Sequence, residues 1–130
     1  MPDVEWIQEL CLSFPNVTED MPWGDDLCFK VRGKIFTVMS LSDGRFPRIT
    51  FKCSPEAFDE LIEVEGICPA PYVGRYKWVM LSNSNVLPAN ELEGLIRRSY
   101  ELVAANAPKR AKAPEKKAVG QQRSTKRPQK

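Results

Sequence analysis

The chain has 130 residues, which suits one domain with a single core. Hydrophobic residues make up 42% of it, and no apolar run approaches the ~20 residues that a membrane-spanning helix needs. The N-terminal segment MPDVEWIQEL lacks a basic stretch followed by an apolar one, so no secretory signal is expected and the predicted location is the cytoplasm.

The residue types present exclude several kinds of chemistry. The chain has no histidine, which excludes Ser–His–Asp and Cys–His catalysis. Its four cysteines (Cys11, Cys28, Cys53 and Cys68) form no CxxC pair, so a zinc site would need ligands from four separate segments. Buried reduced thiols are expected instead, and the sequence predicts no enzyme activity, cofactor or bound metal.

The net charge of +2 hides a strong asymmetry along the chain. Residues 106–130 hold nine Lys/Arg and one acidic residue, which gives this segment a net charge of +8. Residues 1–105 hold ten basic and sixteen acidic residues, a net charge of −6. We therefore expect an acidic domain over 1–105 followed by a disordered basic tail over 106–130, because the tail has almost nothing to bury.

The first third of the chain predicts a helix, a loop and a hairpin. Residues 2–13 place apolar side chains at helical spacing, with most acidic residues on the other side. Residues 14–24 contain two prolines and a glycine, which predicts an ordered loop with apolar anchors. Residues 27–31 and 34–39 alternate in polarity around a two-residue Arg-Gly turn, the pattern of a β-hairpin.

A simple two-residue turn fixes the register of this hairpin. It pairs Phe29 with Phe36 on the core side and Cys28 with Thr37 on the opposite side. A third strand at 48–53 also alternates, so three strands leave an outer face that carries Lys30, Arg48, Thr50 and Lys52.

The remaining elements complete a two-layer domain. Ser54 and Pro55 form a strong helix start, and Gly66 ends that helix. An extended connector at 67–72, a strand at 77–81 and a final helix from about residue 88 follow. The predicted order is helix, three strands, helix, strand, helix. This order predicts an α+β fold with a mainly antiparallel sheet and helices on one face.

Basic side chains on the outer sheet face and hairpin form the main candidate site. Strand ribbons can follow a phosphate backbone, and Lys/Arg neutralisation of phosphates gives sequence-tolerant affinity. The alternative is a polar face that is only solvated, since cations on strands also discourage edge pairing. The candidate nucleic-acid-binding residues are Lys30, Arg32, Lys34, Arg45, Arg48, Lys52, Arg75 and Lys77.

Three further groups carry weaker hypotheses. The acidic residues Glu19, Asp20, Asp25 and Asp26 could bind a hard cation, but such loop acids more often close turns or neutralise nearby cations. The acidic residues Glu56, Asp59, Glu60 and Glu63 give one helix a face that could dock a protein or be merely solvated. Trp23, Trp78 and Tyr100 could stack bases if exposed, but core packing is favoured for both tryptophans because they lie in apolar runs.

Several linked motifs resemble those of the MmcQ/YjbR-like family, a widespread group of small bacterial proteins. They are FPNVTED at 14–20, PWGD at 22–25, FKVRGKIF at 29–36, KCSP at 52–55, KW at 77–78 and SYELV at 99–103. They occur in the family's order, and the resemblance spans about residues 4–105, without the tail. One departure is the segment Arg75-Tyr76-Lys77, where other members often show a histidine before the tryptophan.

The resemblance implies a frataxin-like (CyaY-like) α+β fold and a role as a DNA-binding protein. The family is compared with a "double wing" mode, in which the sheet and its hairpins meet the duplex, and it supplies no catalytic residues to carry over. The sequence thus predicts a non-enzymatic DNA-binding protein that uses its basic sheet face and hairpin, assisted by the tail. The alternative is a protein-interaction or chaperone-like module that uses its acidic helix faces, and a frataxin-type metal-handling protein is a distant third.

Overall fold

The computed structural model describes residues 2–71 and 73–106, so the predicted tail lies outside the described residues. The elements of the described part, in chain order, are α1 (Val4–Leu12), β1 (Val17–Trp23), β2 (Asp26–Val31), β3 (Lys34–Ser40), the short 3-10 helix η1 (Leu41–Asp43), β4 (Ile49–Lys52), α2 (Pro55–Leu61), β5 (Ile67–Pro69), the 3-10 helix η2 (Gly74–Tyr76), β6 (Trp78–Leu81) and α3 (Ala89–Asn106).

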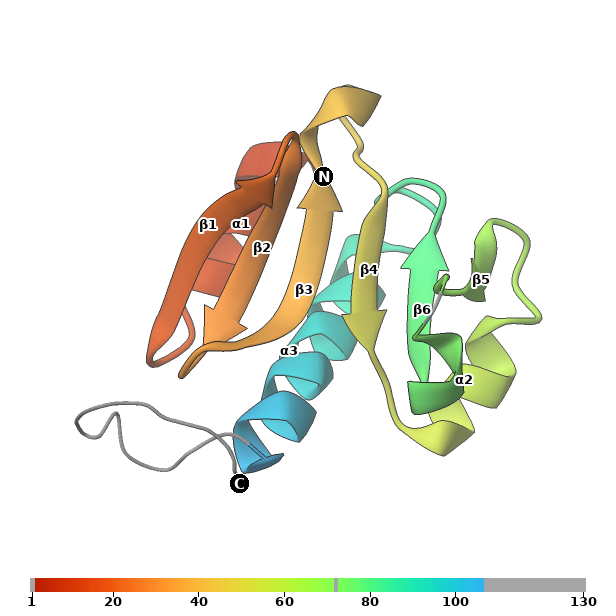
Figure 1. Cartoon of the computed structure of the whole chain (residues 1–130). Coiled ribbons are helices and arrows are strands. Elements are labelled where there is room, and N and C mark those ends of the chain that lie inside the picture. The colour runs from red at the N-terminus through yellow and green to blue at the C-terminus, as the bar shows by residue number, and fades with distance from the viewer. Residues whose placement is uncertain (1, 72, 107–130) are drawn as a thin grey trace.

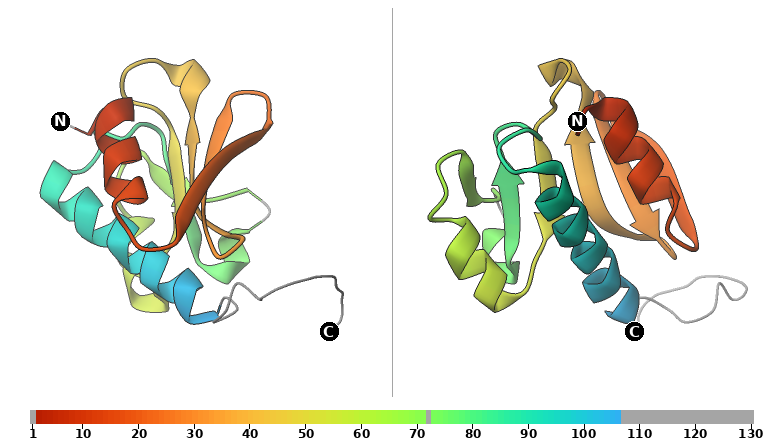
Figure 2. Two further views of the ribbon diagram at one scale, coloured as in Figure 1. Left: turned by 90° about the vertical axis from the view of Figure 1, so that its left-hand side faces the viewer. Right: turned by 180° about the vertical axis from the view of Figure 1, so that it is seen from behind.

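The six strands form one sheet in the order β1-β2-β3-β4-β6-β5, and every neighbouring pair is antiparallel (Figure 1). All three α-helices lie on one face of this sheet, as the view from behind shows (Figure 2). The other face, which we call the open face, carries no α-helix of the described part of the chain. The predicted two-layer α+β fold is confirmed. None of the described helices is both long enough and apolar enough to span a bilayer.

The helices begin where the sequence provides caps. The Asp3 carboxylate accepts a hydrogen bond from the Trp6 amide at 3.0 Å at the start of α1. The Ser54 hydroxyl accepts one from the Ala57 amide at 3.1 Å at the start of α2, where proline occupies the first position as predicted. The buried side of α3 consists of Leu92, Ile96, Ser99 and Val103, and it packs across the middle strands.

Two segments that the sequence predicted as irregular are the edge strands of the sheet. The predicted loop over 14–24 contains β1, and the predicted connector over 67–72 contains β5. Pro22 lies in β1 and Pro69 ends β5. An edge strand needs hydrogen bonds on one side only and therefore tolerates proline. Pro22 and Pro69 therefore lie in strands that pair with a neighbour on one side only.

The β2–β3 hairpin has the predicted turn but not the predicted register. Arg32 and Gly33 both have positive φ angles, 50° and 86°, as a tight two-residue hairpin turn requires. The next rung pairs Lys30 with Ile35 as predicted, but beyond it Phe29 faces Thr37 because a β-bulge intervenes. The predicted pairs Phe29–Phe36 and Cys28–Thr37 are therefore wrong.

The bulge turns two successive side chains of β3 towards the helices. Phe36 and Thr37 are both fully buried. The Phe36 ring lies edge-on to Tyr100 of α3, with the two ring centroids 5.5 Å apart. The Thr37 hydroxyl is the one buried side-chain oxygen in the described residues without a hydrogen bond of ordinary geometry. The regular register already directs Phe36 inward, so the effect of the bulge is to bury Thr37 and Met39 and to place Val38 on the open face.

Ser99 of α3 joins β3 to β4 where their pairing stops. The ladder between the two strands ends at the pair Thr37–Phe51, and the strands separate beyond it (Figure 1). The buried Ser99 hydroxyl accepts a hydrogen bond from the Lys52 amide at 3.0 Å and donates one to the Phe36 carbonyl at 2.6 Å. It therefore satisfies two backbone groups that the strands no longer satisfy for each other.

The cysteines divide into three buried thiols and one exposed thiol. Cys11, Cys28 and Cys53 are buried, while Cys68 is exposed on β5. Burial raises the pKa of Cys11 to about 12, against a smaller opposing effect of the Thr37 hydroxyl. Burial also raises the pKa of Cys53 to about 11, against the opposing charges of Lys52 and Lys77, and it raises the pKa of Cys28. The prediction of buried thiols is confirmed for these three cysteines and is wrong for Cys68.

Replacing Ser99 with Ala is expected to destabilise the domain. The substitution leaves the Lys52 amide and the Phe36 carbonyl without their shared partner, so the free energy of unfolding should fall by about 1–3 kcal/mol. Urea denaturation measures this change. Ser82→Ala removes an exposed hydroxyl and serves as the control, within about 0.5 kcal/mol of wild type. A Ser99→Ala variant as stable as that control contradicts the bridging role.

A thiol reagent is expected to modify Cys68 quickly and the other cysteines slowly. The reactive species is the thiolate, and buried thiols with raised pKa values are both protonated and inaccessible near about pH 8. Dithionitrobenzoate should therefore release one rapid equivalent from the native chain and four from the chain in denaturant. A Cys68→Ser variant should lose the rapid phase. Rapid release of two or more equivalents from the native chain would show that the buried thiols are accessible.

Candidate nucleic-acid interface

Four of the predicted cationic residues come together at one end of the sheet. Because neighbouring strands are antiparallel, β2 and β4 end where β3 and β6 begin (Figure 1). Arg32 lies in the β2–β3 turn, Lys34 begins β3, Lys52 ends β4 and Lys77 precedes β6. We call these four residues the basic end of the sheet. Arg75 falls in η2, two residues before Lys77.

The side chains of the basic end have no acidic partner within the described part of the chain. Lys34 is exposed, and Arg32 is partly exposed. The Lys52 ammonium donates a hydrogen bond to the Tyr76 carbonyl at 2.8 Å. The Lys77 ammonium lies 4.8 Å from the centroid of the Phe58 ring. Neither contact neutralises the positive charge, so both side chains can still attract an anion.

The other predicted cations do not join this group. Lys30 forms an ion pair with Asp20, with the ammonium nitrogen 3.1 Å from a carboxylate oxygen. Arg45 and Arg48 lie between β3 and β4 at the opposite end of the sheet, and the Arg45 guanidinium stacks over Phe46 at 5.2 Å from the ring centroid. The predicted residues therefore divide between two ends of the sheet and do not cover its outer face evenly.

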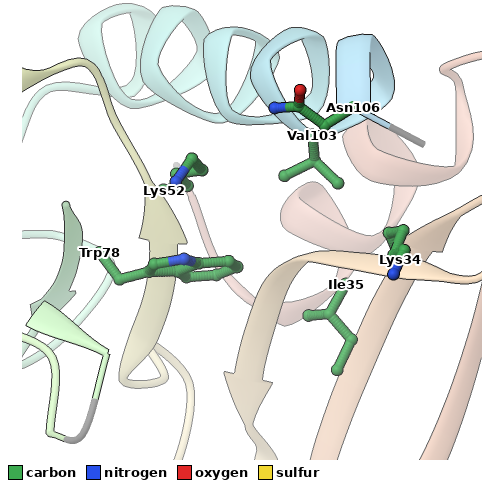
Figure 3. A pocket seen from close by; sticks show the side chains of 6 residues that line it. All are labelled: Lys34, Ile35, Lys52, Trp78, Val103 and Asn106. Atoms are coloured by element: carbon green, nitrogen blue, oxygen red, sulfur yellow. The ribbon is translucent and has the colours of Figure 1, made fainter. Parts of the chain in front are cut away.

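A hollow lies within the basic end, where β3 and β4 separate. It has a volume of about 290 Å³ and is lined by Lys34, Ile35, Lys52, Trp78, Val103 and Asn106. Figure 3 shows that Val103 and Asn106 reach it from α3, while the other four side chains come from the strands. The Ser99 bridge keeps β3 and β4 connected next to this hollow. The hollow thus combines two ammonium groups with an aromatic ring.

Trp78 lies on the open face of the sheet, so the prediction that it packs in the core is wrong. Val79 is fully buried beneath the helices, and strand alternation directs Trp78 to the other side. Its side chain is partly exposed. It also lines a second hollow of about 230 Å³ together with Ile35, Val38, Thr50 and Val73. This second hollow is mainly apolar.

The position of Trp78 follows from the alternating burial along β6, which the composition of this segment does not reveal. In the run Trp78-Val79-Met80-Leu81, the residues Val79 and Leu81 are buried, and Trp78 and Met80 alternate with them on the open face. The continuous apolar composition of the run hid this alternation. The apolar centre of the open face was missed for the same reason.

The acidic candidates do not form a metal centre. Glu19 accepts a hydrogen bond from the Gln8 side chain at 3.0 Å, and Asp20 pairs with Lys30. Within the described residues, no three Cys, Asp or Glu side chains gather in a way that could hold a metal ion. The acidic residues on and after α2 are exposed, as the sequence predicted. Tyr100 is partly buried, and its hydroxyl donates to the Pro15 carbonyl at 2.7 Å, which gives it a structural role.

The chain is similar to one protein-family model and to solved structures of bacterial proteins. The YjbR family model matches residues 12–102. Protein DR2400 of Deinococcus radiodurans, which has the domain DUF419, is similar in structure with a TM-score of 0.72 and 26% sequence identity, over 80% of each chain. A Pseudomonas syringae protein shares the fold with a TM-score of 0.61 and 22% identity, over 76% of this chain and 97% of its own. No curated protein matches the sequence.

The family match covers most of the part of the chain that the structure describes, from the end of α1 to the last turns of α3. It includes the hairpin, the basic end of the sheet, Trp78 and Ser99. On this match, the chain belongs to the YjbR family.

Proposed function

We propose that this protein is a non-enzymatic, cytoplasmic DNA-binding protein that contacts phosphates through the basic end of its sheet. The observation that carries the proposal is the convergence of Arg32, Lys34, Lys52 and Lys77 from separate strands, without an acidic partner in the described residues. Cations grouped in this way attract a phosphate backbone and release its counterions.

The acidic net charge of residues 1–105 is compatible with this function. Interactions between exposed charges weaken strongly beyond a Debye length of about 8 Å at physiological salt. A phosphate group at the basic end therefore responds mainly to the cations beside it. The exposed acidic residues of α2 form no ion pair with a residue of the basic end in the described part of the chain.

The basic C-terminal segment supports the same function. Its nine Lys/Arg residues follow Asn106 in the sequence, and Asn106 lines the hollow that Lys34 and Lys52 share. The segment that carries these cations is therefore covalently attached next to the basic end. We propose that the segment adds sequence-independent affinity and that the basic end orients the nucleic acid.

Neutralising two lysines of the basic end is expected to weaken DNA binding and its dependence on salt. In a Lys34→Gln/Lys52→Gln variant of the full chain, two phosphate contacts are lost. The slope of log K against log salt should then become shallower by about 2, with affinity reduced on any duplex sequence. Fluorescence anisotropy with a labelled duplex, titrated at several salt concentrations, measures both quantities.

The matched control removes two positive charges elsewhere. Arg97→Gln/Arg98→Gln alters exposed residues of α3 that pair with Glu93 and Glu101, and it should change the slope little. Equal slopes in the two variants would show that only overall charge matters and would overturn the assignment of the interface. Absence of duplex binding by the wild-type chain at low salt would overturn DNA binding itself and favour a protein-interaction module.

A further inference from the structure

We propose that the open face binds the unpaired nucleotides of single-stranded nucleic acid, with one base stacked on Trp78 and the neighbouring phosphates held by Lys34 and Lys52. The inference rests on the proposed function, and it names the class of nucleic acid that the same site prefers. It follows from how the indole ring, the apolar side chains and the two lysines are arranged.

Trp78 stands between the two hollows of this region. Both hollows include its side chain, and both also include Ile35 of β3. In Figure 3 the indole ring extends from β6 towards Ile35, with Lys52 and the helix α3 on one side of it. The second hollow adds Val38, Thr50 and Val73. The ring is thus accessible from the open face next to apolar side chains, as a platform for another flat ring requires.

The chemistry of the second hollow suits a base better than a phosphate. Its lining is apolar apart from Thr50, so an anion placed there would lose its hydration without gaining a charged partner. A base that stacks on the indole loses little hydration from its faces and gains favourable contact with the ring. The Thr50 hydroxyl, which is partly exposed, offers a hydrogen-bonding group to the edge of the base.

The charges next to the platform suit the backbone of the same strand. Lys34 and Lys52 line the first hollow, which shares Trp78 with the second. The hydrogen bond from the Lys52 ammonium to the Tyr76 carbonyl, at 2.8 Å, fixes this positive charge close to the indole. A phosphate next to a stacked nucleotide can therefore meet these ammonium groups while the base meets the ring.

A duplex cannot use this platform in the same way. Within a double helix each base is already covered on both faces by its neighbours, so an aromatic side chain on a sheet meets only base edges or backbone. A duplex could reach the cations of the basic end without engaging Trp78. Single strands offer free base faces and therefore gain the additional stacking contact.

Removing the Trp78 ring is expected to weaken single-strand binding selectively. Stacking of one base on an aromatic side chain corresponds to a loss of about 5- to 150-fold on substitution by Ala. The full chain and its Trp78→Ala variant should be titrated with a labelled thymidine single strand and with a duplex of equal length at one salt concentration. We expect the wild type to bind the single strand more tightly, and Trp78→Ala to lose affinity for that strand alone.

Two further variants guard against effects on folding. Trp78→Phe keeps an aromatic ring and should retain most of the single-strand affinity. Ile35→Glu leaves the indole in place but adds a carboxylate that both hollows share, so it should reduce single-strand binding by repelling phosphates. Circular dichroism confirms that each variant is folded. A uridine RNA strand of the same length shows whether the preference extends to RNA.

The outcomes separate this inference from the proposed function. Equal or tighter binding of the duplex, or unchanged single-strand affinity in both Trp78→Ala and Ile35→Glu, overturns the stacking site. If the duplex still depends on Lys34 and Lys52 in that case, the proposed function stands without it. Failure of the wild type to bind either nucleic acid overturns both, and it would favour a protein as the occupant of the apolar face.

Discussion

The hydroxyl of Ser99 is the contact on which the geometry of the candidate site depends. It is the only side chain in the described residues shown to hydrogen-bond both β3 and β4, through the Phe36 carbonyl and the Lys52 amide. A direct continuation of the ladder would close the space between the two strands. Separation without a bridge would leave two backbone groups unsatisfied in the protein interior, which is costly. The helix thus takes over hydrogen bonds that a neighbouring strand would otherwise make.

This arrangement connects the packing of the core to the chemistry of the surface. The Phe36 ring packs against Phe14 and Tyr100, and the Phe36 carbonyl accepts the hydrogen bond from Ser99. On the other side of the same junction lie Lys34, Lys52 and Trp78. The Ser99 hydroxyl therefore hydrogen-bonds the backbone of Phe36, whose ring is buried, and the backbone of Lys52, whose ammonium belongs to the basic end.

The sequence predicted the parts of this domain in which one local signal dominates. Helix caps at Ser54, alternation at Ile49 and Phe51, and the Arg-Gly turn each gave the structure that they indicated. The β-bulge could not be predicted in this way, because it buries the successive residues Phe36 and Thr37, and an alternating pattern does not indicate two inward side chains in a row. The edge strands were missed because proline was taken as a break, although only an interior strand excludes it.

The candidate site was predictable in composition but not in arrangement. Counting charges selected the right kind of residue, but only the antiparallel register shows that Arg32 and Lys77 lie at one end of the sheet and Arg48 at the other. Trp78 was misplaced because an apolar run does not by itself reveal which of its residues face the helices. Which of them face the helices depends on how the strand pairs and packs within the whole sheet.

The edge strands also bear on how copies of this chain can associate. β5 spans three residues and ends in Pro69, and β1 carries Glu19, Asp20 and Pro22 along with a break in its register. Short, charged or proline-bearing edges are poor templates for a further strand. Two copies that met edge to edge would gain few hydrogen bonds, so polymerisation by sheet extension is disfavoured at both borders.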